Sequence, residues 1–372
     1  MHKRKFTFLI ILTILTIVLA ACQPAAAVES TSAPEAEAGE SAAEMPAEET
    51  EKEVIRFGDQ QWDTLWINNA IAGYIIEKGY GYPVETIELT TPVALQSIET
   101  GDIDVIMELW RANIMEWYNR VTEEGLVVDL GNSFDVSTQG WYVPRYVIEG
   151  DAERGIEPMA PDLKSVEDLA RYVEVFQDPE DSSKGVFVNA ITGWQVAEVN
   201  RAKFKAYGLL DLYNFQEPGS SGALDAAIAG AYKKGEPVLA YYWEPTWLMG
   251  TYDMVLLEEP AYSDECWAEI AQYVEGSISL DDVTEKSGCA FESTGIHKGV
   301  YAGLIERAPE VTEFLSKMEI PTPLLNELAA YMAADDQIDA DDTAVYFLQN
   351  HPELWTEWVP EVTASAIQAT LE

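Results

Sequence analysis

The sequence predicts an α/β protein with two lobes of similar design, and three observations support this prediction. Residues 54–110 alternate between strand-like and helix-like patterns in the order β-α-β-α-β, which is typical of a mostly parallel sheet with helices on its faces. The same alternation returns over residues 165–243. The last predicted strand of each half ends at a tryptophan, Trp110 in the first and Trp243 in the second.

The elements of the first half follow from hydrophobic patterns and from the residues that end them. Residues 62–78 carry apolar side chains at helical spacing and stop at Gly79. A second helix opens at Thr91-Pro92 and ends at Gly101. Short apolar runs predict three strands, at 54–58, 84–89 and 103–109.

The second half and the C-terminal part are predicted in the same way. Helical patterns and strand patterns alternate, with helices at 165–172, 195–207 and 224–233 and strands at 185–189 and 237–242. From Tyr301 onward the pattern is mainly helical and punctuated by prolines. The acid-rich residues 335–342 lack the glycine at the sixth position and the distal glutamate of a calcium loop, so an exposed turn is predicted there.

The N-terminus has the layout of a secretory signal, predicted at 1–22: a basic start, an almost wholly apolar run and small residues before Cys22. The ending Leu19-Ala20-Ala21-Cys22 resembles the lipobox of bacterial lipoproteins, which implies that Cys22 becomes the lipid-modified first residue. An ordinary cleaved signal with an accidental cysteine is the alternative. Residues 23–53 contain nine Glu, one Lys and no aromatic residue, so a disordered acidic tether is predicted before the folded body.

Charge and cysteine content limit the classes of partner. The formal net charge is −43, which repels nucleic acid phosphates and makes nucleic acid an improbable partner class. This charge favours a cationic ligand, or reflects adaptation to salt. Cys266 and Cys289 form an even pair in a chain predicted to be exported, so a disulfide between them is expected. His297 and His351 are the only histidines after the signal, and no Cys/His spacing predicts a metal site or a cofactor.

Four of the eleven tryptophans stand at the carboxyl ends of predicted strands. They are Trp62, Trp110, Trp194 and Trp243. In open α/β sheets ligands bind beyond these strand ends. A quaternary ammonium group has no N–H to donate, and the negative faces of aromatic rings, tryptophan above all, attract it through cation–π contacts. The sequence thus predicts an aromatic cage, with ordinary packing as the alternative for any single tryptophan.

Four short motifs stand out along the body: GDIDV at 101–105 ahead of Trp110, GWYVPRYV at 140–147, GW at 193–194 and YYWEPTW at 241–247. Together they resemble the glycine betaine/choline/proline-betaine binding subunits of ABC importers, over about 54–360. The resemblance implies a two-lobed periplasmic-binding-protein fold of type II with the ligand cleft between the lobes. The expected lobes are 54–139 plus 293–372 and 140–292, hinged near 138–145 and 288–296.

The resemblance also implies which residues bind the ligand. Three aromatic residues enclose the trimethylammonium group in that family, and they correspond by position to Trp110, Trp194 and Trp243. Trp62 matches an aromatic residue of the choline-binding branch. Backbone N–H groups of the kind at Gln195 and Val196, at a predicted helix N-terminus, hold the ligand carboxylate. Trp141 is counted as a secondary contact.

One family contact is missing. Some members use a histidine four residues after the Trp110 position, where this chain has Ile114, and Asn113 or Gln195 would have to substitute. Glu108 is expected on the same strand face as Trp110. There it would attract a cation and disfavour a ligand carboxylate. The alternative is that Glu108 and Glu244 face away or pair with Arg111 or Arg145.

The predicted function is therefore that of a substrate-binding subunit, not an enzyme, lipid-anchored on the outer face of the cell membrane. It would capture a quaternary ammonium osmolyte and deliver it to a membrane permease driven by an ATPase. Glycine betaine, choline, carnitine and proline betaine stay open as ligands. The alternatives are a binding protein for another solute such as a sugar, and an extracytoplasmic glycosidase with paired carboxylates.

Overall fold

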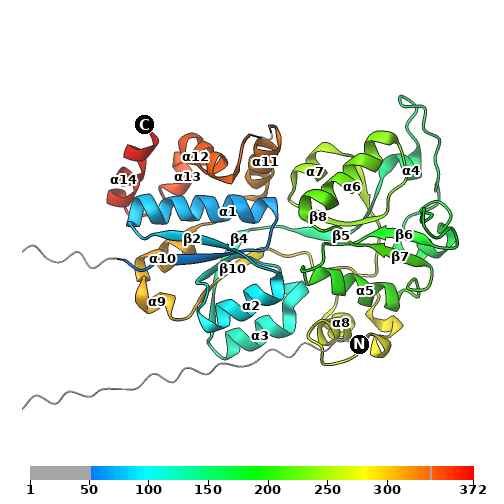
Figure 1. The fold of residues 1–372 in the computed structure, drawn as a ribbon, viewed down its shortest axis with the longest axis horizontal. Helices are drawn as coiled ribbons and strands as arrows, with labels where there is room; N and C mark the ends of the chain where they lie inside the picture. The colour runs from blue at the N-terminus through cyan, green and yellow to red at the C-terminus, as the bar shows by residue number, and fades with distance from the viewer. Residues whose placement is uncertain (1–51, 336) are drawn as a thin grey trace, which may run out of the picture. The chain divides into compact units, whose positions relative to one another are not determined.

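The computed structural model describes residues 52–335 and 337–372. The predicted signal peptide, Cys22 and nearly all of the predicted tether therefore lie outside the described residues. Two five-stranded sheets organise the described part (Figure 1), and each is flanked by helices on both faces. This is the two-lobed α/β architecture that the sequence predicted.

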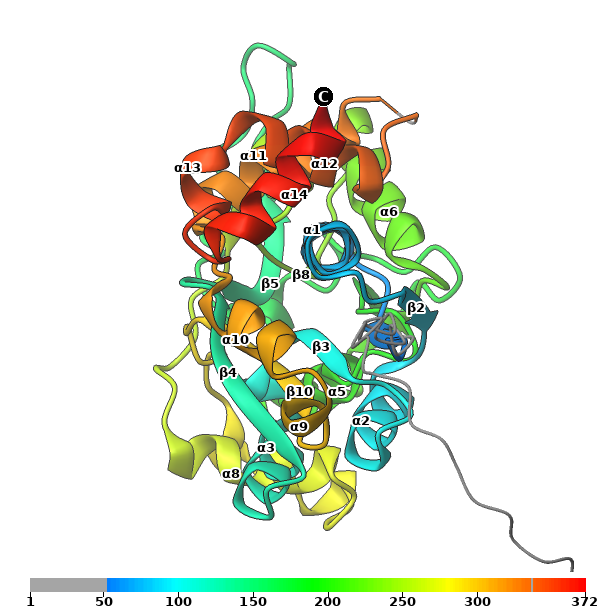
Figure 2. The same cartoon turned by 90° about the vertical axis from the view of Figure 1, so that its left-hand side faces the viewer.

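The first sheet has the strand order β2-β1-β3-β10-β4. Its strands are β1 (Ile55–Asp59), β2 (Val84–Glu88), β3 (Val105–Leu109), β4 (Val127–Phe134) and β10 (Ile296–Tyr301). β1 pairs in parallel with β2 and β3, whereas β10 is antiparallel to both β3 and β4. On one face lie α2 (Thr91–Thr100) and α3 (Met115–Glu123), and on the other lies α1 (Asp63–Tyr74) (Figures 1 and 2).

The second sheet has the order β7-β6-β8-β5-β9. Its strands are β5 (Thr138–Pro144), β6 (Gly185–Val188), β7 (Tyr213–Gln216), β8 (Ala240–Glu244) and β9 (Met254–Leu256). β6 is parallel to β7 and β8, and β5 is antiparallel to β8 and β9. Its helices are α4 (Arg145–Glu149), α5 (Val196–Ala206), α6 (Ser221–Lys234), α7 (Trp247–Thr251) and α8 (Asp264–Val274).

The sheets are mixed but mostly parallel in strand direction, as the β-α-β patterns predicted. In each sheet four strands run in the same direction, and one strand, β10 in the first sheet and β5 in the second, runs against its two neighbours. The segment 165–172, predicted to be helical, forms a 3₁₀-helix at Val166–Arg171.

Gly79 does not end the first helix as expected. α1 continues as a π-helix over Ile75–Tyr80, and the turn comes at Gly81, which has a φ of 74°. Gly79 instead leaves room for a neighbouring helix, because an added Cβ would lie 2.7 Å from Thr363 and 2.9 Å from Ile367. Its role is close packing and not helix termination.

The C-terminal part is helical, as predicted. It comprises α9 (Leu304–Arg307), α10 (Pro309–Lys317), α11 (Thr322–Ala333), α12 (Ala340–Asn350), α13 (Pro352–Trp355) and α14 (Glu361–Leu371). α11 and α12 cover α1, and α11 also contacts α7 of the second half. These helices thus bridge the two halves on one side.

Two segments cross between the sheets, one joining β4 to β5 and one leading into β10. They are hydrogen-bonded to each other. The Ser137 backbone N–H and Oγ donate to the Thr294 carbonyl at 3.2 and 2.7 Å, and Ser293 Oγ donates to the Ser137 carbonyl at 3.1 Å. The first crossing is therefore 135–137, and most of the expected hinge segment 138–145 is strand β5.

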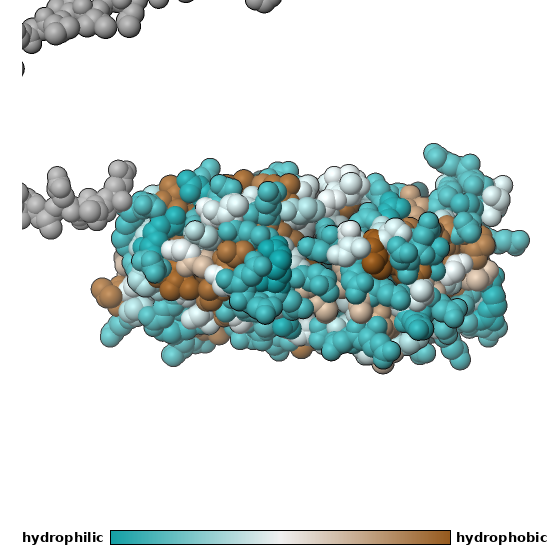
Figure 3. All heavy atoms as spheres, turned by 90° about the horizontal axis from the view of Figure 1, so that it is seen from below, coloured by the Kyte–Doolittle hydropathy of each residue, from teal (hydrophilic) through white to brown (hydrophobic). Residues whose placement is uncertain are grey.

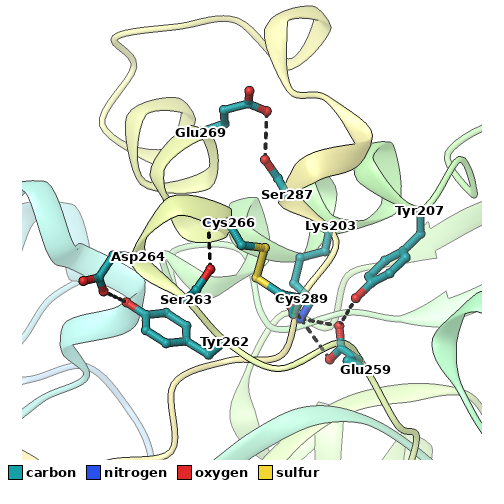
Figure 4. The surroundings of a disulfide bond; sticks show 10 residues. All are labelled: Lys203, Tyr207, Glu259, Tyr262, Ser263, Asp264, Cys266, Glu269, Ser287 and Cys289. Carbon is teal, nitrogen blue, oxygen red and sulfur yellow. Dashed lines mark hydrogen bonds and ion pairs between the residues drawn. A yellow bond between two sulfur atoms is a disulfide. The ribbon is translucent and has the colours of Figure 1, made fainter.

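A disulfide joins Cys266 on α8 to Cys289, ahead of the second crossing (Figure 4). Beside it, the fully buried Lys203 ammonium donates to Glu259 at 2.9 Å and to the Cys289 carbonyl at 2.7 Å. Tyr207 donates its hydroxyl to the same carboxylate at 2.7 Å. These contacts fix α5, α8 and the loop before β10 to one another.

The surface seen in Figure 3 is mostly hydrophilic, with hydrophobic residues in small separate patches. No helix among residues 52–335 and 337–372 is long and apolar enough to cross a bilayer.

Candidate functional site

Four tryptophans meet at one cavity between the two sheets. Trp62 precedes α1, Trp110 follows β3, Trp194 lies just before α5, and Trp243 is in β8. The Trp194 ring stands edge-on to two others, with centroids 5.6 Å from Trp62 and 5.1 Å from Trp243. Each half of the molecule contributes two of the four rings. The strand-end positions read from the sequence therefore converge in space.

Eight of the nine residues expected to contact the ligand line this cavity. They are the four tryptophans together with Glu108, Asn113, Gln195 and Val196. Ile114, which replaces the histidine used by some members of the resembled family, lines it as well. Apolar surface and indole rings make up most of the wall, and Glu108 is the only carboxyl group among the lining residues, which include no Lys, Arg or His.

Trp141 is not part of the site, which corrects its assignment as a secondary contact. It is completely buried in β5, where its ring packs on Phe187 and Phe204 at centroid distances of 5.1 and 4.3 Å. Its Nε1–H donates to Asn200 Oδ1 at 2.8 Å. Trp141 therefore belongs to the core between the second sheet and α5.

Glu108 lies behind the cage and binds two of its rings. Its Oε2 accepts hydrogen bonds from Trp62 Nε1 at 2.6 Å and from Trp110 Nε1 at 3.1 Å, and its Oε1 accepts one from Asn68 at 3.1 Å. Burial raises the pKa of Glu108 to about 7, against the opposing effect of these donors. The carboxylate is thus held by N–H groups, and within the described residues no cationic side chain pairs with it.

The alternative ion pairs considered from the sequence do not form. Arg111 donates to Thr294 Oγ1 at 3.0 Å, and Arg145 pairs with Asp253 and Glu149, each at 2.9 Å. Glu244 is exposed and is not among the lining residues. Only the first of the two strand-end glutamates therefore belongs to the site.

The loop before α5 reaches across to the first half. Trp194 Nε1 donates to the Gln60 carbonyl at 2.7 Å, and the Thr91 N–H donates to the Gly193 carbonyl at 2.8 Å. Gly193 has a φ of 109°, and a Cβ there would lie 3.0 Å from Thr90 Cγ2. Glycine at this position therefore permits the two halves to touch at the cavity edge.

Polar groups without partners gather at the cavity. Gln60 Oε1 and Asn113 Oδ1 are buried and unpaired within the described residues. In the same described part, the backbone N–H groups of Gln195 and Val196 donate to no protein group, and they stand at the start of α5. Such N–H groups at a helix N-terminus suit an anionic or strongly accepting group.

Gln60 and Tyr241 were missed by the sequence reasoning although both line the cavity. Gln60 follows β1 directly, so the rule that placed the tryptophans at strand ends also applies to it. Tyr241 lies inside β8, and its hydroxyl donates to Gln139 Oε1 at 2.9 Å. Its motif, YYWEPTW, was noticed, but which of its aromatic residues face the cavity depends on the register of the folded sheet.

Comparison with known proteins identifies the family. Residues 53–350 match the family described as the substrate-binding domain of the ABC-type glycine betaine transport system, OpuAC. The chain belongs to this family. It is therefore a substrate-binding protein of an ABC importer, a class whose members work outside the cytoplasm and pass a small ligand to permease components.

This OpuAC-family chain aligns with its relatives over nearly their full lengths. The trimethylamine N-oxide-binding protein of Pelagibacter ubique is 23% identical over 305 residues, covering 82% of this chain and 90% of that protein. The glycine betaine/proline betaine-binding periplasmic protein of Salmonella typhimurium is 22% identical over 342 residues, covering 87% and 93%. The crystal structure of the glycine betaine, L-proline-binding protein of Borrelia burgdorferi superposes with a TM-score of 0.65 at 19% identity, covering 84% of this chain and 99% of that one. The last comparison supports the fold.

Proposed function

We propose that this OpuAC-family chain captures glycine betaine or a related quaternary ammonium compound in the cage formed by Trp62, Trp110, Trp194 and Trp243. The convergence of four indole rings on one cavity, with a carboxylate behind two of them, carries the proposal. A methylated cation gains from aromatic faces and a nearby negative charge without needing hydrogen bonds of its own.

Magnitudes indicate that the cage acts together with polar contacts. Each desolvated cation–π contact contributes roughly 1–2 kcal/mol, so three or four give about 3–8 kcal/mol. Micromolar binding requires about 8 kcal/mol. The N–H groups of Gln195 and Val196 and the amides of Gln60 and Asn113 supply candidates for the remainder.

The two alternative functions lack support at the site. A glycosidase needs two carboxyl groups flanking the scissile bond, and the cavity lining has one, Glu108, held by three N–H donors. A sugar-binding site would place many planar polar side chains beside the stacking rings. Here the described lining residues are mainly indoles and aliphatic side chains.

Capture is proposed to occur by closure of two lobes, 54–139 plus 293–372 and 140–292. Each half supplies two rings, so a ligand in the cage joins the halves, and the Trp194 and Gly193 contacts reinforce the closed form. Motion is expected about 135–137 and 288–296, where the chain crosses between the sheets. The closed form is proposed to dock on a membrane permease coupled to an ATPase.

Titration of the purified chain beginning at residue 52 tests the ligand class. Glycine betaine, choline, carnitine, proline betaine and trimethylamine N-oxide are compared with glucose and maltose by isothermal calorimetry. Trp110→Ala, Trp194→Ala and Trp243→Ala are each expected to weaken binding at least about tenfold, the loss of one cation–π contact. The matched control is Trp247→Ala, outside the cavity. Binding of a sugar alone, or normal binding by all three variants, would refute the proposal.

We also propose that Cys22 carries the lipid anchor and that 23–53 tethers the folded body to the outer face of the cell membrane. The signal-like residues 1–21 and the lipobox-like ending support this. Full-length protein expressed in a bacterial host and labelled with radioactive palmitate is expected to carry the label. Cys22→Ala is expected to lose both the label and the membrane fraction. Equal labelling of the two forms contradicts the assignment.

A further inference from the structure

Glu108 is the one carboxyl group among the residues that line the cavity, and its surroundings are unusual for a buried carboxylate. It is 1% exposed, and three N–H donors from Trp62, Trp110 and Asn68 surround it. Buried carboxylates are ordinarily neutralised by a paired cation or a metal. The three donors satisfy its oxygens, but they leave its negative charge uncompensated.

We propose that Glu108 is a positioning and selectivity residue. It fixes the rings of Trp62 and Trp110 in the cage, and its negative charge couples capture of a methylated cation to release of a proton. This inference rests on the proposed function, since it concerns the same cavity. It adds a role for a residue that touches the cage from behind.

The positioning role follows from one shared acceptor. Trp62 and Trp110 come from different segments of the chain. Both Nε1–H groups point to the same oxygen, Glu108 Oε2, at 2.6 and 3.1 Å, which adds a directional restraint to the packing of each ring. Because a cation is attracted by the face of an indole and repelled by its edge, ring orientation decides the strength of each contact.

The charge role follows from burial. A carboxylate in a low-dielectric cavity interacts far more strongly with a nearby cation than the same pair in water. Three N–H donors favour the ionised form, yet burial raises the pKa of Glu108 to about 7. A bound cation favours ionisation and therefore lowers that pKa. By linkage, affinity for the cation rises as the pH rises through about 7, and binding below that pH releases a proton.

The effects of other charged groups near Glu108 on the pH dependence of binding must be distinguished from the effect of Glu108 itself. Asp63, at the start of α1, interacts electrostatically with both Glu108 and Asp225 of α6. Arg111, next along the chain from Trp110, stacks on Tyr118 and bonds Thr294. On the neighbouring strand β10, His297 is held by Asp129 at 2.6 Å. Asp63 is the group most able to mimic a Glu108 effect, so its own variant is needed.

Choline is the first probe, because it has no group that titrates between pH 5.5 and 8.5. Its dissociation constant is measured by calorimetry at pH 5.5, 7.0 and 8.5. The dissociation constant of the wild type is expected to fall by about tenfold across this range. This is the change expected when binding releases one proton over about one pH unit. Glu108→Gln keeps the size and one acceptor but not the charge. It is expected to bind about tenfold more weakly at pH 8.5 and to show a flat pH profile.

The controls are Glu244→Gln, the glutamate that flanks Trp243 but is exposed, and Asp63→Asn. Both are expected to keep the rising profile. A flat wild-type profile, or a profile that Asp63→Asn abolishes and Glu108→Gln retains, overturns the inference. Should Glu108→Gln not fold, the wild type still tests the idea, because calorimetry in buffers of different ionisation enthalpy counts released protons. No proton release at pH 6.5 overturns it, whereas failure of the wild type to bind any methylated ammonium refutes the proposed function itself.

Discussion

At the residue scale, position on a strand separates the cage tryptophans from the core tryptophans. Trp62, Trp110 and Trp194 follow strands, and Trp243 is the fourth residue of the five in β8. Trp141 and Trp267 are equally large but completely buried, and each satisfies its Nε1–H inside the core or against a neighbouring loop. The strand-end rule therefore picked out the tryptophans that line the cavity, whereas Trp141, which motif resemblance alone placed at the ligand, lies in the core.

Trp194→Phe tests the contact that this residue makes across the cavity. The substitution keeps an aromatic face but removes the 2.7 Å hydrogen bond to the Gln60 carbonyl. A net loss of about 1 kcal/mol corresponds to roughly fivefold weaker binding, expected mainly as faster ligand dissociation because the closed form is less stable. Stopped-flow fluorescence measures that rate.

The matched control for this test is Trp247→Phe, which loses a similar bond to Asp225 outside the cavity. It is expected to release ligand at the wild-type rate. An unchanged dissociation rate in Trp194→Phe would show that the Gln60 bond does not stabilise the closed form.

At the element scale, the sequence predicted the elements whose pattern is local. β1, β2, β3 and the helices between them are contiguous, and their hydrophobic periods are readable. β10 was not predicted, because its sequence IHKGVY interrupts the apolar pattern with a histidine, a lysine and a glycine. The buried Lys298 is tolerated there because its ammonium donates to the Asn132 carbonyl of β4, a partner far away in sequence.

The same limit applies to the site. Which residues stand at strand ends could be predicted, and eight of nine proved to line one cavity. The convergence of Trp62, Trp110 and Asn68 on the carboxylate of Glu108 could not be predicted. It depends on side-chain directions that the packing of α1 against β3 sets. Gln60 was predictable in principle from its place directly after β1, but the cation–π argument that singled out the tryptophans does not extend to an amide side chain.

At the scale of the whole molecule, the residues of the proposed cage also connect the two halves. Two rings come from each half, the Trp194 loop contacts Gln60 and Thr91, and the C-terminal helix α11 spans from α1 to α7. Glu108, which is buried, and Asp63, which is half-buried, lie where the halves meet, without a cationic side chain in the cavity lining. Under the proposed function, a cationic ligand would offset the cost of holding negative charge there.

This cost predicts the pH dependence of stability. Burial raises the pKa of Glu108 to about 7. The pKa of Asp63 is also raised to about 7, mainly by burial and secondly by repulsion from the carboxylate of Asp225. The folded state then holds more protons than the unfolded state between about pH 4 and 7, so these groups favour folding at low pH and lose that contribution as the pH rises through 7. Burial alone would raise the pKa of Asp129, but hydrogen bonds from His297 and Tyr118 outweigh it and lower that pKa to about 2. The contribution of Asp129 to folding stability is therefore lost only in strong acid.

The unliganded chain from residue 52 is therefore expected to be most heat-stable near pH 5 and to lose roughly 2–4 °C in Tm between pH 5.5 and 7.5, as one to two extra protons are released. Saturating choline is expected to raise Tm more at pH 7.5 than at pH 5.5, because the cation stabilises ionised Glu108. Differential scanning calorimetry at constant ionic strength measures both effects. The doubly substituted Glu108→Gln, Asp63→Asn chain should show a flatter slope over this range, since its buried site no longer titrates. A Tm that rises from pH 5.5 to 7.5, or the same slope in the double variant, would show that buried negative charge does not limit the unliganded fold.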